Sequence, residues 1–348
     1  MKVQRLVFLI GFFSIHLAHG DNPKAEFGAF VDTYFAFDAN QPPTRERLFT
    51  TSPSRHSEFN LNLAYIEAKI AADKLRGRFA VQTGTSVMAN YASEYRDPAR
   101  TGIQLADILM FAQEAYAGYQ VLPGLWVDAG IFLSHIGAES FISKDNWTYT
   151  RSLVADFSPY YQAGVRLGWE IDSAWAFQFH LMNGWQRIVE TDGDKAIGTQ
   201  ISFKANDKLS FIHNTFIGKE TSFRFFQDLI VKYQPAGFWE TCLTLDLGLQ
   251  NSATWWGTSW LNRLRLSRGT YGGARLEYYS DPTGVNVPTG TSNGFQVFGA
   301  SANLDVSLTP QLLWRNEVRY LQSADAIFSG SSLKSSTVFG VSSLSLSL

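Results

Sequence analysis

Ionisable and aromatic side chains are concentrated between His135 and Leu167, in the segment HIGAESFISKDNWTYTRSLVADFSPYYQAGVRL. Loops of more than about 12 to 15 residues without regular structure are usually functional or disordered, and the aromatic residues here argue against disorder. An ordered surface loop is one interpretation. We favour the other, a loop that folds into a hollow interior. The charged residues that it would carry inward are Glu139, Lys144, Asp145, Arg151 and Asp156.

Basic residues form a second group, mainly in the last third of the chain. Its members are Arg263, Arg265, Arg275, Arg315 and Arg319, with Arg166 from an earlier segment. All six lie in stretches where apolar and polar residues alternate, so they would come from strands and share one polar interior. The five late arginines would lie on nearby strands and form a basic wall.

The two groups together predict a pore with a charged constriction. We hypothesise that Glu139, Asp145 and Asp156 face the arginine wall across the narrowest point. Opposed charges would create a transverse electric field, which orders water and favours polar over apolar solutes. Neither sign dominates the polar faces as a whole, so the expected ion selectivity is weak. For each residue, local pairing that holds the loop to the barrel is an equally good interpretation.

Catalytic chemistry has little support in the sequence. The histidines after residue 20 are His56, His135, His180 and His213, and no HExxH or paired-cysteine motif accompanies them. Cys242 is the only cysteine, so no intrachain disulfide can form. We predict no enzyme activity, no cofactor and no metal, although spacing alone leaves open a Ser/His pair on a lipid-facing surface.

Period-two alternation runs through almost the whole chain after residue 20. In AEFGAFVDTYFAFD, for example, Phe27, Val31 and Phe37 share one face, and Asp32 and Asp38 share the other. Roughly sixteen such segments of about ten residues follow one another, and ten residues is the length of a tilted transmembrane strand. The sequence therefore predicts an all-β protein, a transmembrane antiparallel β-barrel of about 16 strands.

Short and long connections alternate along the chain. Tight-turn residues occur at 73–74, 122–124 and 171–173. Longer polar stretches lie near residues 40–57, 88–108, 134–158, 183–195, 251–258, 281–293 and 322–335. This alternation is typical of short periplasmic turns and longer extracellular loops. The 134–158 loop would follow the fifth strand, where we expect it to fold inward.

Composition separates a membrane barrel from a soluble β-sandwich or propeller, which would also alternate. Charged residues make up 17% and aromatic residues 15% of the chain, whereas soluble domains contain about 25% charged residues. Full charges also fall in mid-strand and aromatic residues near strand ends, which favours the membrane. The net charge of -2 and the lack of a basic tract exclude a nucleic-acid partner.

Residues 1–20 are typical of a secretory signal peptide. Lys2 and Arg5 precede a short apolar run, and residues 18–20 form a small-x-small cleavage site. The run is shorter than the roughly 20 residues of a transmembrane helix. We therefore predict an exported protein with a signal peptide at 1–20, a single barrel domain at 21–348 and no membrane-spanning helix.

Four stretches resemble β-barrel porins of the OmpL-like type from Gram-negative bacteria. They are SHIGAESFISKDNWTYTRSLVADFSPYYQAGVRL, NGWQ at 183–186, EYYSDPTG at 277–284 and LLWRNEVRY at 312–320. The resemblance spans nearly all of the chain after residue 20, and it implies an outer-membrane barrel that admits small solutes by diffusion. Many such barrels end on Phe or Trp, whereas this sequence ends on Leu348.

These features predict a porin that conducts small polar solutes or ions through a water-filled lumen constricted by the 134–158 loop. The expected partners are outer-membrane lipid and lipopolysaccharide, the solutes themselves and, by analogy with general porins, two further copies in a homotrimer. The alternative is a non-conducting outer-membrane barrel that acts as an adhesin or a structural anchor.

Overall fold

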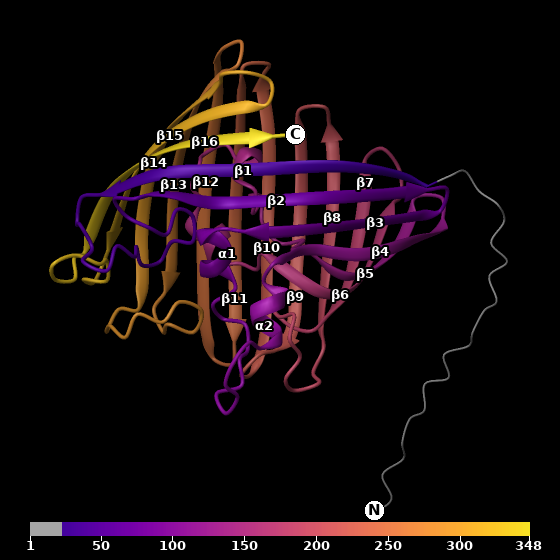
Figure 1. Cartoon of the computed structure of the whole chain (residues 1–348), viewed down its shortest axis with the longest axis horizontal. Coiled ribbons are helices and arrows are strands. Elements are labelled where there is room, and N and C mark those ends of the chain that lie inside the picture. The colour runs from indigo at the N-terminus through magenta and orange to yellow at the C-terminus, as the bar shows by residue number, and fades with distance from the viewer. Residues whose placement is uncertain (1–22) are drawn as a thin grey trace, which may run out of the picture.

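The computed structural model describes residues 23–348, and the predicted signal peptide lies outside them. The described chain forms a closed barrel of sixteen antiparallel strands (Figure 1). Each strand pairs with the strands before and after it in the sequence, and β1 closes the ring by pairing with β16. The predicted fold class and strand number are therefore confirmed.

The strands are joined by connections that contain only short helices. The strands are β1 (Lys24–Asp38), β2 (Phe59–Ala72), β3 (Leu75–Thr83), β4 (Ala112–Leu122), β5 (Leu125–Leu133), β6 (Tyr161–Glu170), β7 (Trp175–Met182), β8 (Ala196–Asn206), β9 (Leu209–Lys219), β10 (Phe223–Ala236), β11 (Trp239–Gln250), β12 (Ala253–Ser267), β13 (Thr270–Asp281), β14 (Phe295–Ser307), β15 (Leu312–Ser323) and β16 (Ser336–Ser347). The helices are α1 (Thr85–Asn90), α2 (Leu105–Leu109), the 3-10 turn η1 (Ser143–Asp145) and α3 (Leu153–Asp156). No helix within residues 23–348 is long and apolar enough to cross a membrane.

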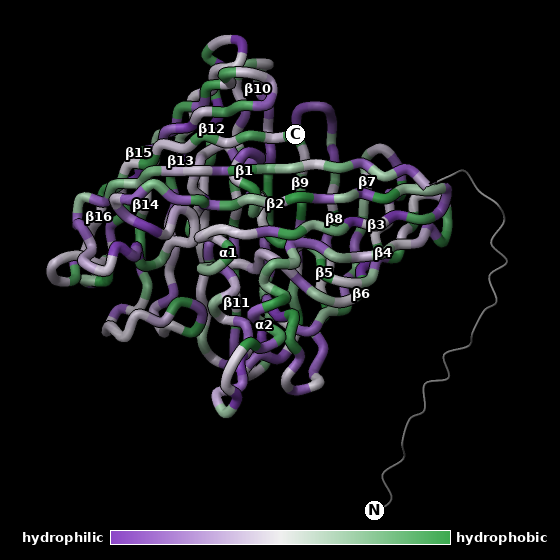
Figure 2. Tube along the Cα trace, in the orientation of Figure 1, coloured by the Kyte–Doolittle hydropathy of each residue, from purple (hydrophilic) through white to green (hydrophobic). Residues whose placement is uncertain are grey.

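Alternation gives every strand an outer and an inner face. On β1, Phe27 is 81% exposed and Val31 is 39% exposed, whereas Phe30 and Asp32 are fully buried. Successive side chains of a strand point to opposite faces, so the exposed apolar residues form the outer surface and the polar ones enter the barrel. The colours along the strands in Figure 2 alternate accordingly. Figure 1 also shows β1 to β6 crossing the strands of the far wall at a steep angle, as the strong strand tilt of a barrel requires.

The long connections all lie at one end of the barrel, as the sequence predicts, although short connections occur at both ends. Outer-membrane barrels place short turns in the periplasm, so we call the end with the long loops extracellular. The expected loop near 251–258 is an error, because only residues 251–252 separate β11 from β12. The polar residues there belong to a strand in which Trp255 is buried inside and Trp256 is 46% exposed outside.

Candidate functional site: a loop packed inside the barrel

The connection between β5 and β6, residues 134–160, lies inside the barrel rather than over its mouth. We call it the inner loop. Many of its residues form hydrogen bonds with the wall or with one another. Its short helix α3 is capped by Ser152, whose side chain accepts from Ala155 N. All four residues of α3 are buried. The loop that the sequence predicts to fold inward therefore does so.

Arg275 of β13 holds the middle of the inner loop. Its Nη1 donates to Thr148 Oγ1 and to the Thr150 carbonyl, both at 2.7 Å. Its side chain is fully buried between the carboxylates of Glu277 and Glu317, each 3.2 Å away. Buried charges are tolerated when they are paired and fully hydrogen-bonded. The arginine therefore serves both as a counter-ion within the wall and as a donor to the loop.

The two wall carboxylates also bind the loop backbone. Glu317 accepts from Thr150 N at 2.6 Å and from Thr150 Oγ1 at 2.8 Å. Glu277 accepts from Leu153 N at 2.7 Å, at the start of α3. Arg319 of β15 lies 2.7 Å from Glu277 and is fully buried. Two arginines and two glutamates thus form one buried, electrically balanced cluster under the loop.

Arg315 of β15 anchors the preceding part of the loop. It pairs with Asp305 of β14 at 2.7 Å and donates to the carbonyls of Ser143 and Asn146, the latter at 2.8 Å. On the opposite side, Ser143 Oγ donates to Asp32 of β1 at 2.7 Å. The η1 turn is therefore held by two strands that lie on either side of β16.

The beginning of the inner loop is fixed against β6, β9 and β10. His135 contacts Gln162 through Nδ1 and the Thr215 carbonyl through Nε2, each at 3.0 Å. Gly137 N donates to Asp228 at 2.9 Å. Burial lowers the pKa of His135, since protonation would place a charge where little water can reach it. The imidazole is consequently neutral near pH 7.

Apolar side chains also pack between the inner loop and the wall on two sides of the loop. On one side, Leu153 and Val154 pack in a cluster that includes Phe216 and Trp255 of the wall. On the other side, Ile142 belongs to a second cluster that includes Tyr91 and Tyr161. The wall is shaped for this packing: a Cβ on Gly273 would lie 2.6 Å from Trp147 O, and one on Gly257 would lie 2.6 Å from Val154 Cγ1.

The five predicted loop charges have different surroundings. Glu139 accepts from Ser152 N at 3.1 Å and lies 3.9 Å from Arg275. Lys144 and Asp145 pair with each other at 2.8 Å and keep 32% and 45% side-chain exposure. Burial raises the pKa of Glu139, and the nearby Arg275 opposes that rise.

The other two loop charges are enclosed near the end of α3. Arg151 is buried with its guanidinium 3.6 Å from the Tyr160 ring centroid, and it donates to the Ala155 carbonyl. Asp156 accepts from Thr51 Oγ1 and from Tyr160 Oη, both at 2.8 Å, and burial raises its pKa. Of the five, only Lys144 and Asp145 face solvent within the lumen.

The expected arginine wall needs correction. Arg275, Arg315 and Arg319 do come from neighbouring strands, but they pair with wall carboxylates and touch the loop directly, so no aperture separates them from it. Only Glu139 among the three expected acidic partners lies within ion-pair distance of one of them. Arg263 pairs with Glu240 at 2.5 Å toward the periplasmic end.

The remaining predicted basic residues lie away from the inner loop. Arg265 is exposed near the periplasmic end of β12. Arg166 of β6 shares Asp128 with Arg76 of β3, at 2.7 Å and 2.6 Å. These two side chains are 20% and 34% exposed. Arg76 was missed in the sequence, although its spacing of two from Arg78 places both on the inner face of β3.

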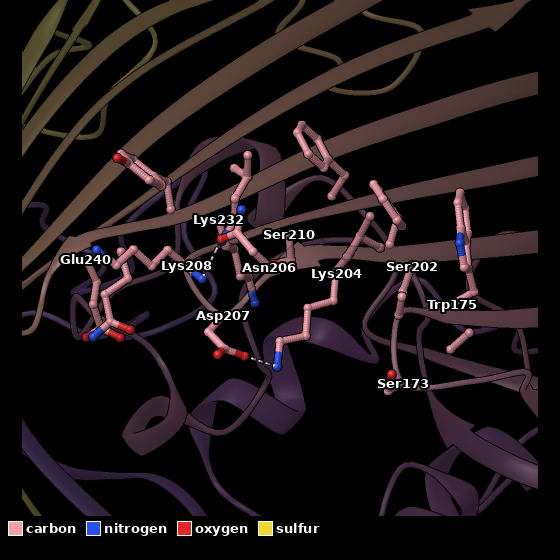
Figure 3. A pocket seen from close by; sticks show the side chains of 18 of the residues that line it. Ser173, Trp175, Ser202, Lys204, Asn206, Asp207, Lys208, Ser210, Lys232 and Glu240 are labelled. Carbon is pink, nitrogen blue, oxygen red and sulfur yellow. Dashed lines mark hydrogen bonds and ion pairs between the residues drawn. The ribbon is translucent and has the colours of Figure 1, made fainter.

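Cavities lie on both sides of the inner loop. The periplasmic cavity, shown in Figure 3, has a volume of about 460 Å³ and is lined by Trp147 of the loop and by wall residues that include Lys204, Lys232 and Glu240. A smaller cavity of about 60 Å³ shares Trp147 and Lys232 with it and reaches Glu139 and Cys242. The extracellular cavity of about 480 Å³ includes Asp156 and Tyr160 of the loop together with Trp185 and Arg224.

Two further kinds of site, a metal site and a hydrolase active site, can be compared with the part of the chain that the structure describes. No group of three or more His, Cys, Asp or Glu residues there is placed to hold a metal ion. A G-x-S-x-G pattern occurs at residues 290–294, in the loop between β13 and β14. The nucleophile elbow with this pattern requires a turn from a strand into a helix. The segment therefore lacks the structural context of a hydrolase.

The apolar outer face, the polar interior and the closed ring of strands define a transmembrane β-barrel. The family model described as "Putative beta-barrel porin-2, OmpL-like" matches residues 24–346. The chain belongs to this family of porins. Family and fold together imply the outer membrane of a Gram-negative bacterium. No curated protein matches the sequence.

Several solved structures, including one named as a porin, share the fold at low sequence identity. The anion-selective porin from Comamonas acidovorans is 10% identical, with a TM-score of 0.59 over 94% of this chain and 100% of that chain. Salmonella typhi OmpF in complex with daunomycin is also 10% identical, with a TM-score of 0.59 over 93% and 97%. OmpT of Vibrio cholerae in its trimer form is 9% identical, with a TM-score of 0.57 over 94% and 100%.

Proposed function

We propose that this protein is a diffusion porin with weak ion selectivity, in which the inner loop is the constriction. The observation behind this proposal is a loop fixed inside a closed sixteen-stranded barrel, with a cavity on each of its two sides. A barrel of this size has an interior wider than its wall side chains alone can fill. Solutes would pass between the inner loop and the part of the wall that it does not contact.

The fully buried arginines, Arg275, Arg315 and Arg319, would then have a structural role, because they hold the loop in place and have no contact with solvent. Selectivity belongs to the charged groups that keep solvent exposure in the lumen. On the loop these are Lys144 and Asp145, and on the wall they include Arg76, Arg166 and Lys232. Both signs are present along the route, and they oppose each other's effect on the local potential. Weak selectivity is the expected result.

Single-channel conductance in a planar bilayer tests this function. The refolded protein should give steady current steps, and a salt gradient should give a small reversal potential. Asp145→Asn removes the exposed loop carboxylate and should shift that potential toward anions. Asp73→Asn, at the exposed turn between β2 and β3, is the matched control. Absence of current from folded protein would refute the porin proposal.

A non-conducting barrel is the second candidate, and one observation favours it. Apolar clusters pack the inner loop against the wall on two sides, and the cavity beside Cys242, between the loop and β10 to β12, has a volume of only about 60 Å³. Such a barrel would serve as an adhesin or an anchor. Loss of surface attachment on deletion, without any change in solute uptake, would distinguish it.

The proposal includes the processing and surroundings expected of a porin. Residues 1–20 would be removed on export, and residues 21–348 would act as a single domain among outer-membrane lipid and lipopolysaccharide. Mass spectrometry of the protein extracted from outer membranes tests the cleavage. A homotrimer is part of the proposal, since one of the similar outer-membrane protein structures is described as a trimer form. Cross-linking in the membrane tests that part.

A further inference from the structure

Arg224 of β10 is a buried cation without a counter-ion. The residue is 7% exposed and lines the extracellular cavity. Its Nε donates to Gln250 Oε1 at 2.7 Å and its Nη1 to Asn286 Oδ1 at 3.3 Å, so both acceptors are neutral amides. Its Nη2 has no hydrogen-bond partner within residues 23–348, and no carboxylate there forms an ion pair with this guanidinium.

The acidic groups nearest to Arg224 are occupied by other donors. Glu220 accepts from Trp185 N at 2.8 Å and pairs with Arg187 at 3.4 Å. Asp281 accepts from two backbone N–H groups of the β13–β14 loop, both at 2.7 Å. Charges buried in folded proteins are normally paired, because burial without a partner is costly. The cavity is therefore short of one negative group at this position.

The other carboxylates of the cavity lining do not fill that role. Glu94 accepts from Tyr161 Oη at 2.8 Å and from Ile188 N at 2.7 Å, which ties two extracellular loops together. Asp156 accepts from Thr51 and Tyr160, and burial favours its neutral form by raising its pKa. Neither carboxylate forms an ion pair with Arg224, so the guanidinium stays available to a ligand.

Aromatic side chains hold the guanidinium in place and add an apolar surface. The Arg224 Cζ lies 4.9 Å from the Trp185 ring centroid and 5.0 Å from that of Trp255. Trp185 also lines the cavity and packs edge-on against Phe216 and Phe226, with centroid distances of 4.9 Å. A planar guanidinium fixed in this way is suited to a carboxylate, and the adjacent indole is suited to a flat apolar group.

We propose that the extracellular cavity binds a small organic carboxylate with a flat apolar substituent, its carboxylate at Arg224 and its apolar part beside Trp185. A volume of about 480 Å³ accommodates a ligand of this size. The binding event would concentrate such anions at the mouth of the channel. Its role in uptake rests on the proposed porin function, whereas the binding itself does not.

Fluorine NMR of 4-fluorobenzoate with the detergent-folded barrel tests the site without requiring conduction. We expect saturable binding of the benzoate, and binding at least about tenfold weaker for the neutral 4-fluorobenzamide. Arg224→Gln should weaken benzoate binding by roughly ten- to a hundredfold. Arg263→Gln, the same substitution at the periplasmic end, should leave the affinity within about twofold of the unmodified protein.

A second variant keeps the test decisive if Arg224→Gln does not fold. Gln250→Glu places a carboxylate where Arg224 already has a hydrogen bond, and the Thr221 hydroxyl, 2.8 Å from the Gln250 amide, can turn to donate to it. This internal counter-ion should abolish benzoate binding in a folded barrel. Equal affinity for benzoate and benzamide, or undiminished benzoate binding in either variant, would overturn the proposal. A barrel that binds without conducting would refute only the porin function, and one that conducts without binding would refute only the site.

Discussion

Replacement of Arg315 by alanine should release the inner loop. The arginine is fully buried, pairs with Asp305 and donates to the carbonyls of Ser143 and Asn146. Breaking a buried ion pair costs about 3 to 5 kcal/mol, and the lower end applies because Asp305 keeps a hydrogen bond from Asn303. Water can satisfy Asp305 and the two carbonyls only when the loop detaches, so the cost falls on the attached state. A change of about 3 kcal/mol corresponds to more than a hundredfold in the attachment equilibrium.

Cys242 is a natural reporter of that release. It is 3% exposed and lines the small cavity together with Asn146, one of the residues that Arg315 holds. Modification of folded protein by a charged methanethiosulfonate reagent, followed by mass spectrometry, measures how often this cavity opens. The Arg315→Ala variant should react at least about a hundredfold faster than the unmodified protein, provided that reclosing is fast compared with modification.

Arg166→Ala is the matched control, since Arg166 lines the lumen and its partner Asp128 keeps Arg76 at 2.6 Å. It makes no hydrogen bond to the inner loop within the described residues, so its removal should leave the Cys242 reaction rate unchanged. The reasoning is refuted if folded Arg315→Ala reacts within about twofold of the unmodified protein. It is also refuted if both variants accelerate the reaction equally, because that would indicate a general loosening of the barrel.

Three further outcomes follow from the packing of the inner loop and the wall. Because burial lowers the pKa of His135, this imidazole binds a proton more readily in the unfolded chain than in the folded one below about pH 6.5. The stability of the unmodified protein should therefore fall as the pH drops below that value. Between about pH 7.5 and 5.5, the unfolding temperature of the His135→Gln variant should fall less than that of the unmodified protein. Asp246 lies directly opposite Asp228 on the neighbouring strand, and both are buried. Because two buried carboxylates repel each other, Asp246→Asn should leave the free energy of unfolding in urea unchanged or raise it by up to about 1 kcal/mol. A clear decrease would contradict this expectation. Leu153→Ala should cost about 2 to 5 kcal/mol in the same assay, because the residue is fully buried in the apolar cluster that seals the loop.

Local patterns in the sequence are sufficient to predict the wall. Each strand has a lipid-facing side, so residues such as Phe27 and Val31 show the membrane environment without knowledge of their neighbours. The inner loop is also predictable, since its length, its aromatic content and its place after the fifth strand are properties of a single segment. The error at residues 251–258 arose because polar residues in a strand, such as Thr254 and Thr258, were read as a loop.

The partners of the charges could not be predicted in the same way. Arg265 and Arg275 have the same side chain and comparable alternating surroundings, yet one is exposed near the barrel rim and the other is buried under the loop. Their different exposure depends on the position of each residue along the barrel axis, which is set by strand register. Arg315 binds Asp305 of the preceding strand and residues about 170 positions earlier in the chain, and no sequence period encodes that second contact.

The anchoring of the η1 turn has a consequence for the order in which the barrel assembles. Asp32 of β1 and Arg315 of β15 both hold Ser143, while β16 lies between these two strands and completes the ring. The inner loop is therefore a bridge across the seam where the first and last strands must meet. Contacts so distant in sequence form late in folding, because the chain between them must first be organised. We expect the loop to enter before the ring closes and to guide the first and last strands into register, so that the segment that narrows the finished channel also helps to complete its wall.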